Sequence, residues 1–288
     1  MTTAVLFRRL HPGLLLASVM LVSSFAGTAR AGSEADAITL APHRAVYDLK
    51  LAKSHGKRSI EAVRGRILYD FSGNVCEGYS LQFRQVSELD TGEGKIAVSD
   101  LRAATWEDGK AAGLRFNSQN FLDQQLSEAV DGRAERSGDD VSVTLTKPQE
   151  KSFKIGTEVV FPTEHVRRAI IAARAGKSIL EFQVYDGSES GEKLYNSLTV
   201  IGKVIPPENK PSDAAAKETA LAGLMRWPVT ISYFDKASST TGEQTPVYAI
   251  AFELYENGVS RNLLLDYGDF SVSGELTQID FKDAKPCK

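Results

Sequence analysis

Histidine is the side chain that most often carries proton or metal chemistry near neutral pH, and this chain of 288 residues has four. Three of them, His43, His55 and His165, follow the N-terminal apolar segment. No two are spaced to share a helix face, and no His-Glu-x-x-His motif occurs, which argues against a zinc hydrolase. We interpret His43 and His165 each as a partly buried hydrogen-bonding residue or a surface residue, and we expect no metal site and no cofactor.

Two short motifs match catalytic or phosphate-binding patterns in isolation. Ser54 and Lys57 have the Ser-x-x-Lys spacing of penicillin-binding proteins, but they lie in a polar turn and the companion motifs of that family do not occur. Residues 176–178 read Gly-Lys-Ser, as in a phosphate-binding loop, but the glycine required five residues earlier is Ile171. No Gly-x-Ser-x-Gly motif of an α/β-hydrolase occurs either. These motifs therefore indicate no activity.

Four carboxylates cluster in the C-terminal part of the chain, at Glu253, Glu256, Asp266 and Asp269. Paired carboxylates are the machinery of glycoside hydrolases, so a hydrolase of glycan or lipid stays open as a second alternative function. Acidic side chains along a strand more often form its solvated face. We therefore name no catalytic residue and expect that the protein is not an enzyme.

The first 31 residues have the composition of a secretory signal peptide. Arg8 and Arg9 form a positive region, an apolar segment follows over residues 14–22, and Ala29-Arg30-Ala31 matches the A-x-A cleavage pattern. We predict a signal peptide over residues 1–31 and export from the cytoplasm. No later apolar stretch approaches the ~18 residues of a membrane span, so we expect no stable membrane insertion after cleavage.

Composition and charge place the chain among soluble globular proteins, with 42% hydrophobic and 25% charged residues. The formal net charge is −3, and loss of the three arginines of the signal peptide makes the mature chain more acidic. An acidic protein without a basic excess is a poor ligand for nucleic acid. We expect no nucleic acid among its partners.

Both cysteines, Cys76 and Cys287, lie in the predicted mature chain. In an oxidising compartment two cysteines permit a single intramolecular pairing, so we predict a Cys76–Cys287 disulfide. The bond would tie the C-terminus to an early part of the domain, and chain entropy gives it a stabilising effect of at most roughly 5 kcal/mol. Its spacing differs from the Cys-x-x-Cys of redox enzymes, which indicates a structural role.

Alternation of apolar and polar residues with a period of two is the main pattern of the mature chain. Residues 44–51 place Ala45, Tyr47 and Leu49 on one face, and similar segments recur to residue 281. Short polar or glycine-containing breaks separate them, which indicates antiparallel strands with one face on a core. About a dozen or more strands cannot form one flat sheet, so the sheet must close, split or spiral.

Three further segments have specific signatures. Residues 163–175 are predicted to form a helix. Pro162-Thr163 should supply its start and its N-cap, and Gly176 should end it. Residues 206–221 read as a surface excursion with a short helix near 214–221, and a domain linker is the alternative. Asn257-Gly258 predicts a hairpin with a type I′ turn.

Aromatic residues are concentrated in the predicted strands. Most of them should belong to the core, and a minority could line a hydrophobic groove or cavity, which a curled sheet forms easily. The strand aromatics are Tyr47, Tyr69, Tyr79, Phe83, Tyr233, Phe234, Tyr248, Phe252, Tyr255 and Tyr267.

Three segments together resemble a known family: APHRAVYDL (residues 41–49), CEGY (76–79) and LDYGDF (265–270). The chain resembles the EipB family, periplasmic cell-envelope integrity proteins of Gram-negative bacteria, over essentially its whole length. The resemblance implies an antiparallel sheet wound into a spiral, nearly a barrel, with a helix that caps one side. It also implies one disulfide, between Cys76 and Cys287, and a non-enzymatic role in envelope maintenance.

The predicted architecture is mainly β, with residues 32–288 as a single β-spiral domain: a large antiparallel sheet, curled into a spiral or barrel-like form, with one or two capping helices. We expect a non-catalytic periplasmic protein that supports cell-envelope integrity by binding an envelope component or a partner protein. The first alternative is a carrier of a lipidated or hydrophobic ligand, which requires a concave apolar face. Strands with a period of two fit both hypotheses.

Overall fold

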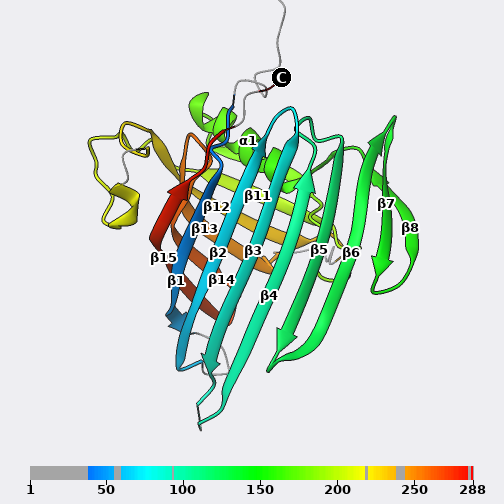
Figure 1. Ribbon diagram of the computed structural model, residues 1–288, viewed down its shortest axis with the longest axis horizontal. Coiled ribbons are helices and arrows are strands. Elements are labelled where there is room, and N and C mark those ends of the chain that lie inside the picture. Colours follow the sequence, from blue (N-terminus) through cyan, green and yellow to red (C-terminus); the bar gives the residue numbers. More distant parts are fainter. Residues whose placement is uncertain are drawn as a thin grey trace, which may run out of the picture. The chain divides into compact units, whose positions relative to one another are not determined.

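A computed structural model shows fifteen strands in one continuous sheet (Figure 1). The structure describes residues 38–54, 60–92, 94–217, 220–237, 244–284 and 287, all within one compact unit, Ser33–Lys288. The predicted signal peptide with Ala29 and Ala31 lies outside the described residues, as do His55 and Lys57.

The order of strands across the sheet is β8-β7-β6-β5-β4-β3-β2-β1-β15-β14-β13-β12-β11-β10-β9. Neighbouring strands are antiparallel except β9 and β10, which are parallel. The first eight strands are β1 (His43–Ser54), β2 (Ala62–Asn74), β3 (Gly78–Asp90), β4 (Ile96–Glu107), β5 (Gly113–Leu122), β6 (Gln125–Ser137), β7 (Asp140–Lys147) and β8 (Lys151–Gly156). The others are β9 (Val159–Val160), β10 (Ile179–Val184), β11 (Tyr195–Ile201), β12 (Arg226–Asp235), β13 (Tyr248–Tyr255), β14 (Ser260–Asp266) and β15 (Phe270–Phe281).

The sheet curls until it nearly closes on itself, as a sheet of this size must. Its two edge strands, β8 and β9, are consecutive in the chain and are separated by Thr157 and Glu158 alone. Arg136 of β6 holds this junction, because its guanidinium donates to the carbonyl oxygens of Thr157 at 2.7 Å and Val159 at 3.0 Å. The predicted fold class, a mainly antiparallel sheet in a spiral or barrel-like form, is confirmed.

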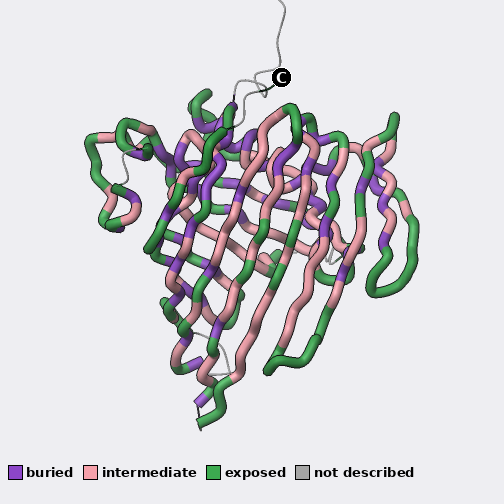
Figure 2. The backbone as a smooth tube through the Cα atoms, in the orientation of Figure 1, coloured by how far each residue is buried: buried purple, intermediate pink, exposed green. Residues whose placement is uncertain are grey.

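The alternation in the sequence decides which face of each strand is turned inward. On β1 the odd-numbered residues Ala45, Tyr47 and Leu49 are all at most 3% exposed, whereas Arg44 and Lys50 are exposed. Burial is densest near the α-helix of the described residues and weakest at the hairpins of the opposite end (Figure 2), where Ile96 is 59% exposed. One end of the curl is therefore covered, and the other is less enclosed.

The covering element is α1 (Pro162–Arg174), which packs its Ala169, Ile170 and Ala173 into the same core cluster as Phe71 and Trp227. Its end is as predicted: Gly176 has φ +70°, and the N–H groups of Gly176 and Lys177 donate to carbonyls of the last turn. The prediction that Pro162-Thr163 supplies the N-cap is wrong. Phe161 is the N-cap residue and Pro162 is the first helical residue.

Two turn regions differ from their predicted conformations. The described residues of the excursion over 206–221, which leave out 218 and 219, contain a 3₁₀ turn, η2 (Ala215–Lys217), in place of the α-helix expected near 214–221. The Asn257-Gly258 hairpin between β13 and β14 forms, but its turn is not type I′. Gly258 has φ +87°, whereas Asn257 is not among the residues of positive φ, and the N–H of Gly258 donates to the Tyr255 carbonyl. Four residues join the two strands, whereas a type I′ hairpin has a two-residue loop. In the longer loop Asn257 does not need the left-handed conformation.

Candidate functional site

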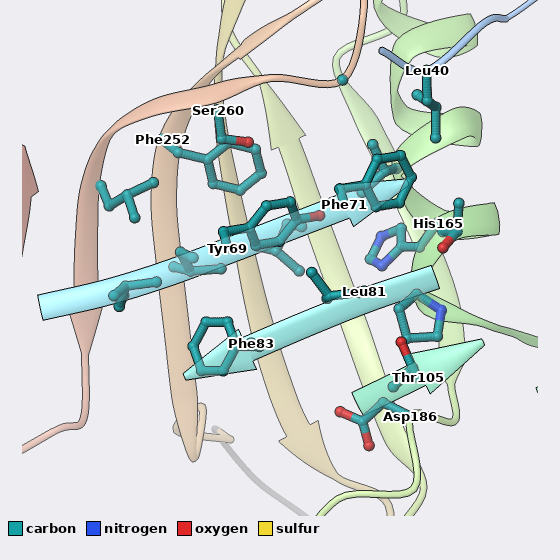
Figure 3. Close-up of a pocket in the computed structure, with 18 of the residues that line it drawn as sticks. Leu40, Tyr69, Phe71, Leu81, Phe83, Thr105, His165, Asp186, Phe252 and Ser260 are labelled. Atoms are coloured by element: carbon teal, nitrogen blue, oxygen red, sulfur yellow. The ribbon is translucent and has the colours of Figure 1, made fainter. Parts of the chain in front are cut away.

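A cavity of about 320 Å³ lies inside the curl, between the inner face of β1–β4 and that of β12–β14. It falls at the lower end of the range of ~300–1,000 Å³ for small-molecule sites. The N-terminal half of α1 covers it, through Pro162, Thr163, His165 and Val166. Figure 3 shows Tyr69, Phe71, Leu81 and Phe83 pointing from one wall into this space.

Cross-strand register explains why these side chains meet. Tyr69 of β2 lies opposite Phe83 of β3, and Phe71 lies opposite Leu81, which in turn lies opposite Thr105 of β4. Directly opposed residues of an antiparallel pair point to the same face, so each inward row continues from strand to strand. On the other wall Tyr233 lies opposite Tyr248 in the same way.

Aromatic rings contribute to both walls of the cavity. The His43 and Tyr69 rings stack with centroids 5.5 Å apart, and those of Tyr233 and Tyr248 stack at 6.1 Å. Gln85 of β3 donates to the hydroxyl of Tyr267 in the β14–β15 turn at 3.3 Å, which links the two walls. A cavity of this composition favours an apolar ligand, because apolar surface gains free energy when it leaves water.

The polar groups of the cavity divide into satisfied and unsatisfied ones. The Tyr47 hydroxyl donates to the Ser260 carbonyl at 2.8 Å. His43 Nδ1 lies 2.7 Å from the carbonyl oxygen of Ala41, which can only accept, so Nδ1 carries the proton and Nε2 is an acceptor. His43 Nε2 is buried and has no partner among the described residues. No residue in that part of the chain forms a hydrogen bond with the Tyr69 hydroxyl, which lies in the cavity lining. Burial lowers the pKa of His43, which keeps the ring neutral.

His165 is held by the strands behind the helix. It is 3% exposed, its Nε2 lies 2.9 Å from the Thr199 hydroxyl, and its ring meets Phe182 edge to face. Burial and, to a smaller extent, the nearby Arg168 lower its pKa to about 4. His165 is therefore a neutral, hydrogen-bonded part of the structure, as the sequence indicated.

Asp186 is the acidic residue among the described residues that line the cavity. It follows β10 and accepts the backbone N–H of Ser188 at 2.9 Å. Burial raises the pKa of its carboxyl, and hydrogen bonds from Ser188 oppose that shift. Figure 3 shows Asp186 apart from the Tyr69 and Phe252 rings.

The acidic cluster singled out in the sequence does not converge on this cavity. Glu253 accepts from Arg226 and Arg261, at 2.5 Å each, and Glu256 pairs with Arg174 at 3.1 Å. Asp266 accepts the backbone N–H of Gly268 in its own turn. None of the four predicted carboxylates lines the cavity.

The two cysteines form a disulfide, with Cα atoms 5.7 Å apart, that joins the β2–β3 turn to the C-terminal segment after β15. Ser54 ends β1, and its hydroxyl accepts the backbone N–H of Ile60. Neither feature belongs to the cavity lining.

The aromatic residues contribute more to the cavity than the sequence indicated. Six of the ten strand aromatics line it, where a minority was expected: Tyr47, Tyr69, Phe83, Tyr233, Tyr248 and Phe252. Alternation placed them on inward faces, but Thr105 and Asp186 carry no signal in the sequence that marks them as cavity residues.

Metal and membrane signatures were also sought in the described residues. They contain no group of three or more His, Cys, Asp or Glu side chains that could hold a metal ion. Within the same part of the chain, no helix is both long enough and apolar enough to cross a membrane.

Comparison with known proteins gives concordant results in sequence and structure. The EipB-like family matches residues 34–283. The cell envelope integrity protein EipB of Brucella abortus (strain 2308) is 37% identical over 268 residues, or 93% of each chain. The crystal structure of a beta-barrel-like protein with a domain of unknown function from Brucella abortus matches with a TM-score of 0.78 and 34% identity, covering 85% of this chain and 100% of that one. The chain belongs to the EipB-like family.

Proposed function

We propose that this protein is a non-catalytic periplasmic protein that supports cell-envelope integrity by holding an apolar envelope component in the cavity beneath α1. The observation that carries the proposal is the aromatic lining of that cavity on two facing walls. The name of the Brucella relative supports the envelope role, and the predicted signal peptide supports the compartment.

A hydrophobic ligand is favoured over a protein docked on the outside of the sheet. The outer face of β2 and β3 carries the exposed arginines Arg64, Arg66 and Arg84. Arg66 pairs with Asp48 and Arg84 with Asp100. The apolar surface that a partner would bury lies inside the curl, where a narrow chain fits better than a folded domain.

The absence of catalysis is supported by the state of the candidate groups. Glu253 and Glu256 are engaged in ion pairs with different arginines, and both described histidines have lowered pKa values because they are buried. None of these four groups is positioned beside another as an acid–base pair in the cavity.

The proposal can be tested with neighbouring residues on β4 that face opposite sides. Thr105 lines the cavity, and Ala104 is exposed on the outer face. We expect purified mature protein to bind the neutral apolar dye N-phenyl-1-naphthylamine, Thr105→Trp to lose most of that binding, and Ala104→Trp to keep it. Equal binding by both variants, or none by the wild type, would contradict the proposal.

The same pair extends the test to cells. In a strain that lacks the gene, we expect Ala104→Trp to restore resistance to detergent and Thr105→Trp to fail, although both accumulate in the periplasm. Restoration by Thr105→Trp would separate the envelope role from the cavity.

A further inference from the structure

We propose that the ligand is a single-chain acyl lipid whose polar group is uncharged and carries both a hydrogen-bond donor and an acceptor, such as an amide or a hydroxyacyl group, and not a fatty-acid anion. This inference rests on the proposed function and specifies its ligand.

The charge of the cavity argues against an anionic head group. The described lining residues include no lysine and no arginine, and the two histidines among them are neutral. The one acidic side chain, Asp186, would repel a carboxylate or phosphate if ionised and could donate a hydrogen bond if protonated. A buried anion without a counter-charge costs far more than a neutral polar group.

The unsatisfied polar atoms argue against a plain hydrocarbon. His43 Nε2 is a buried acceptor without a partner among the described residues. The hydroxyl of Tyr69, a half-buried residue of the cavity lining, can donate to a ligand acceptor. The two rings stack with their centroids 5.5 Å apart, so the two residues occupy the same part of the cavity wall. An N–H or O–H next to a carbonyl meets the two requirements at once.

The remaining surface fits one alkyl chain. Beyond His43 and Tyr69 the walls are formed by apolar side chains such as Phe83, Ile250 and Leu265. A volume of about 320 Å³ is small for the two chains of a diacyl lipid. The polar group therefore lies within the cavity, beside His43 and Tyr69, and the chain fills the space between the walls.

Three probes with the same dodecyl chain test this directly: N-(2-hydroxyethyl)dodecanamide, methyl dodecanoate and dodecanoate. Displacement of N-phenyl-1-naphthylamine at pH 7.5 is measured for each. We expect the amide to bind at least tenfold more tightly than dodecanoate, with the methyl ester, an acceptor without a donor, in between.

Matched variants assign the effect to the cavity. Tyr69→Phe removes the hydroxyl and should weaken amide binding about fivefold, whereas Tyr255→Phe, which removes a buried hydroxyl outside the cavity lining, should not. His43→Asn keeps an N–H for Ala41 and removes the Nε2 acceptor, and it should reduce the preference for the amide over the methyl ester.

The outcomes separate the two proposals. If all three probes displace the dye equally, or dodecanoate binds best, the ligand class is wrong while the apolar site stands. If the Tyr69→Phe and His43→Asn variants both still bind the amide more tightly than the methyl ester, the contacts assigned to these two residues are wrong. If neither dye nor probes bind, the proposed function itself fails.

Discussion

The carboxylate of Glu107 accepts the backbone N–H of Thr163 at 2.7 Å, although the two residues are 56 positions apart. Its other oxygen accepts the N–H of Glu164, also at 2.7 Å. Strand β4 thereby satisfies two free N–H groups at the start of α1, which the local N-cap residue, Phe161, cannot do with its side chain. The first turn of the helix that covers the cavity is therefore capped by a buried carboxylate from β4, and not by the side chain of its own N-cap residue.

Replacing this carboxylate should change both stability and its dependence on pH. Burial raises the pKa of Glu107 from 4.5 to about 7, against the opposing hydrogen bonds from Thr163 and Glu164. The folded state thus binds the proton more tightly than the unfolded state. The resulting stabilisation is complete below about pH 4.5 and is lost as the pH rises through 7.

Glu107→Gln cannot titrate, so we expect the stability of the wild type relative to the variant to fall between pH 4.5 and 7. At neutral pH the variant should still be less stable by about 1 kcal/mol, because one amide oxygen replaces two acceptors. Urea unfolding at several pH values measures both effects. A difference that stays constant with pH would show that Glu107 is ionised throughout this range.

The contribution of His165 to stability should depend on pH in the opposite direction to that of Glu107. Its pKa falls from 6.5 in the unfolded chain to about 4 in the fold, chiefly through burial, so the fold favours the neutral ring. The stabilisation is complete above pH 6.5 and is lost as the pH falls through 4, to a total of about 3 kcal/mol. His165→Gln, which keeps a polar group near Thr199, should lack this loss in the same urea titrations. A parallel decline in both proteins would contradict the assignment.

The predictions from the sequence succeeded where a local pattern decides the structure. Alternation on β1 identifies Tyr47 as inward-facing, and Gly176 marks the end of α1 because the left-handed conformation there suits glycine. The predictions from the sequence failed where a residue far away in the chain determines the local structure. Nothing near Thr163 indicates that Glu107 would cap the helix, and the loop length that spares Asn257 a positive φ depends on how β13 and β14 pair.

The cavity was partly predictable for the same reason. Tyr69 and Tyr79 are both inward-facing in the alternating pattern, yet Tyr69 lines the cavity, whereas Tyr79 packs with α1 in a core cluster. The pattern states which face a side chain is on. Whether two inward faces touch or leave a space depends on the curvature of the sheet and on where α1 lies, which are properties of the whole fold.

The disulfide should stabilise the fold through the unfolded state. Cys76 and Cys287 are separated by 211 residues, and a long closed loop removes more conformational entropy from the unfolded chain. We expect Cys76→Ser to lower stability by about 2–5 kcal/mol and the melting temperature by several degrees. The double variant, with Cys287→Ser as well, should match the single one, because the first substitution already removes the cross-link. Wild-type protein with two free thiols and an unchanged melting temperature would contradict a structural role.

The buried ion network beneath the excursion over residues 206–221 should contribute far more than an exposed ion pair does. Arg261 pairs with Asp213 at 2.9 Å and with Glu253 at 2.5 Å, and the side chains of Arg261 and Asp213 are 5% and 7% exposed. Asp213→Asn removes one carboxylate and leaves the arginine charge buried with less compensation, which costs about 3–5 kcal/mol.

The matched control is Asp48→Asn, because Asp48 pairs with Arg66 at the same distance, 2.9 Å, with side chains 39% and 66% exposed. Solvent screens that pair, so its loss should cost less than about 1 kcal/mol. Chemical unfolding of the two variants in parallel compares the same chemical change in two environments. Equal losses of stability in the two variants would mean that the apolar residues Ala216 and Leu221 attach the excursion. They would also mean that the charges beneath it are no better protected from water than those on the outer face of β1.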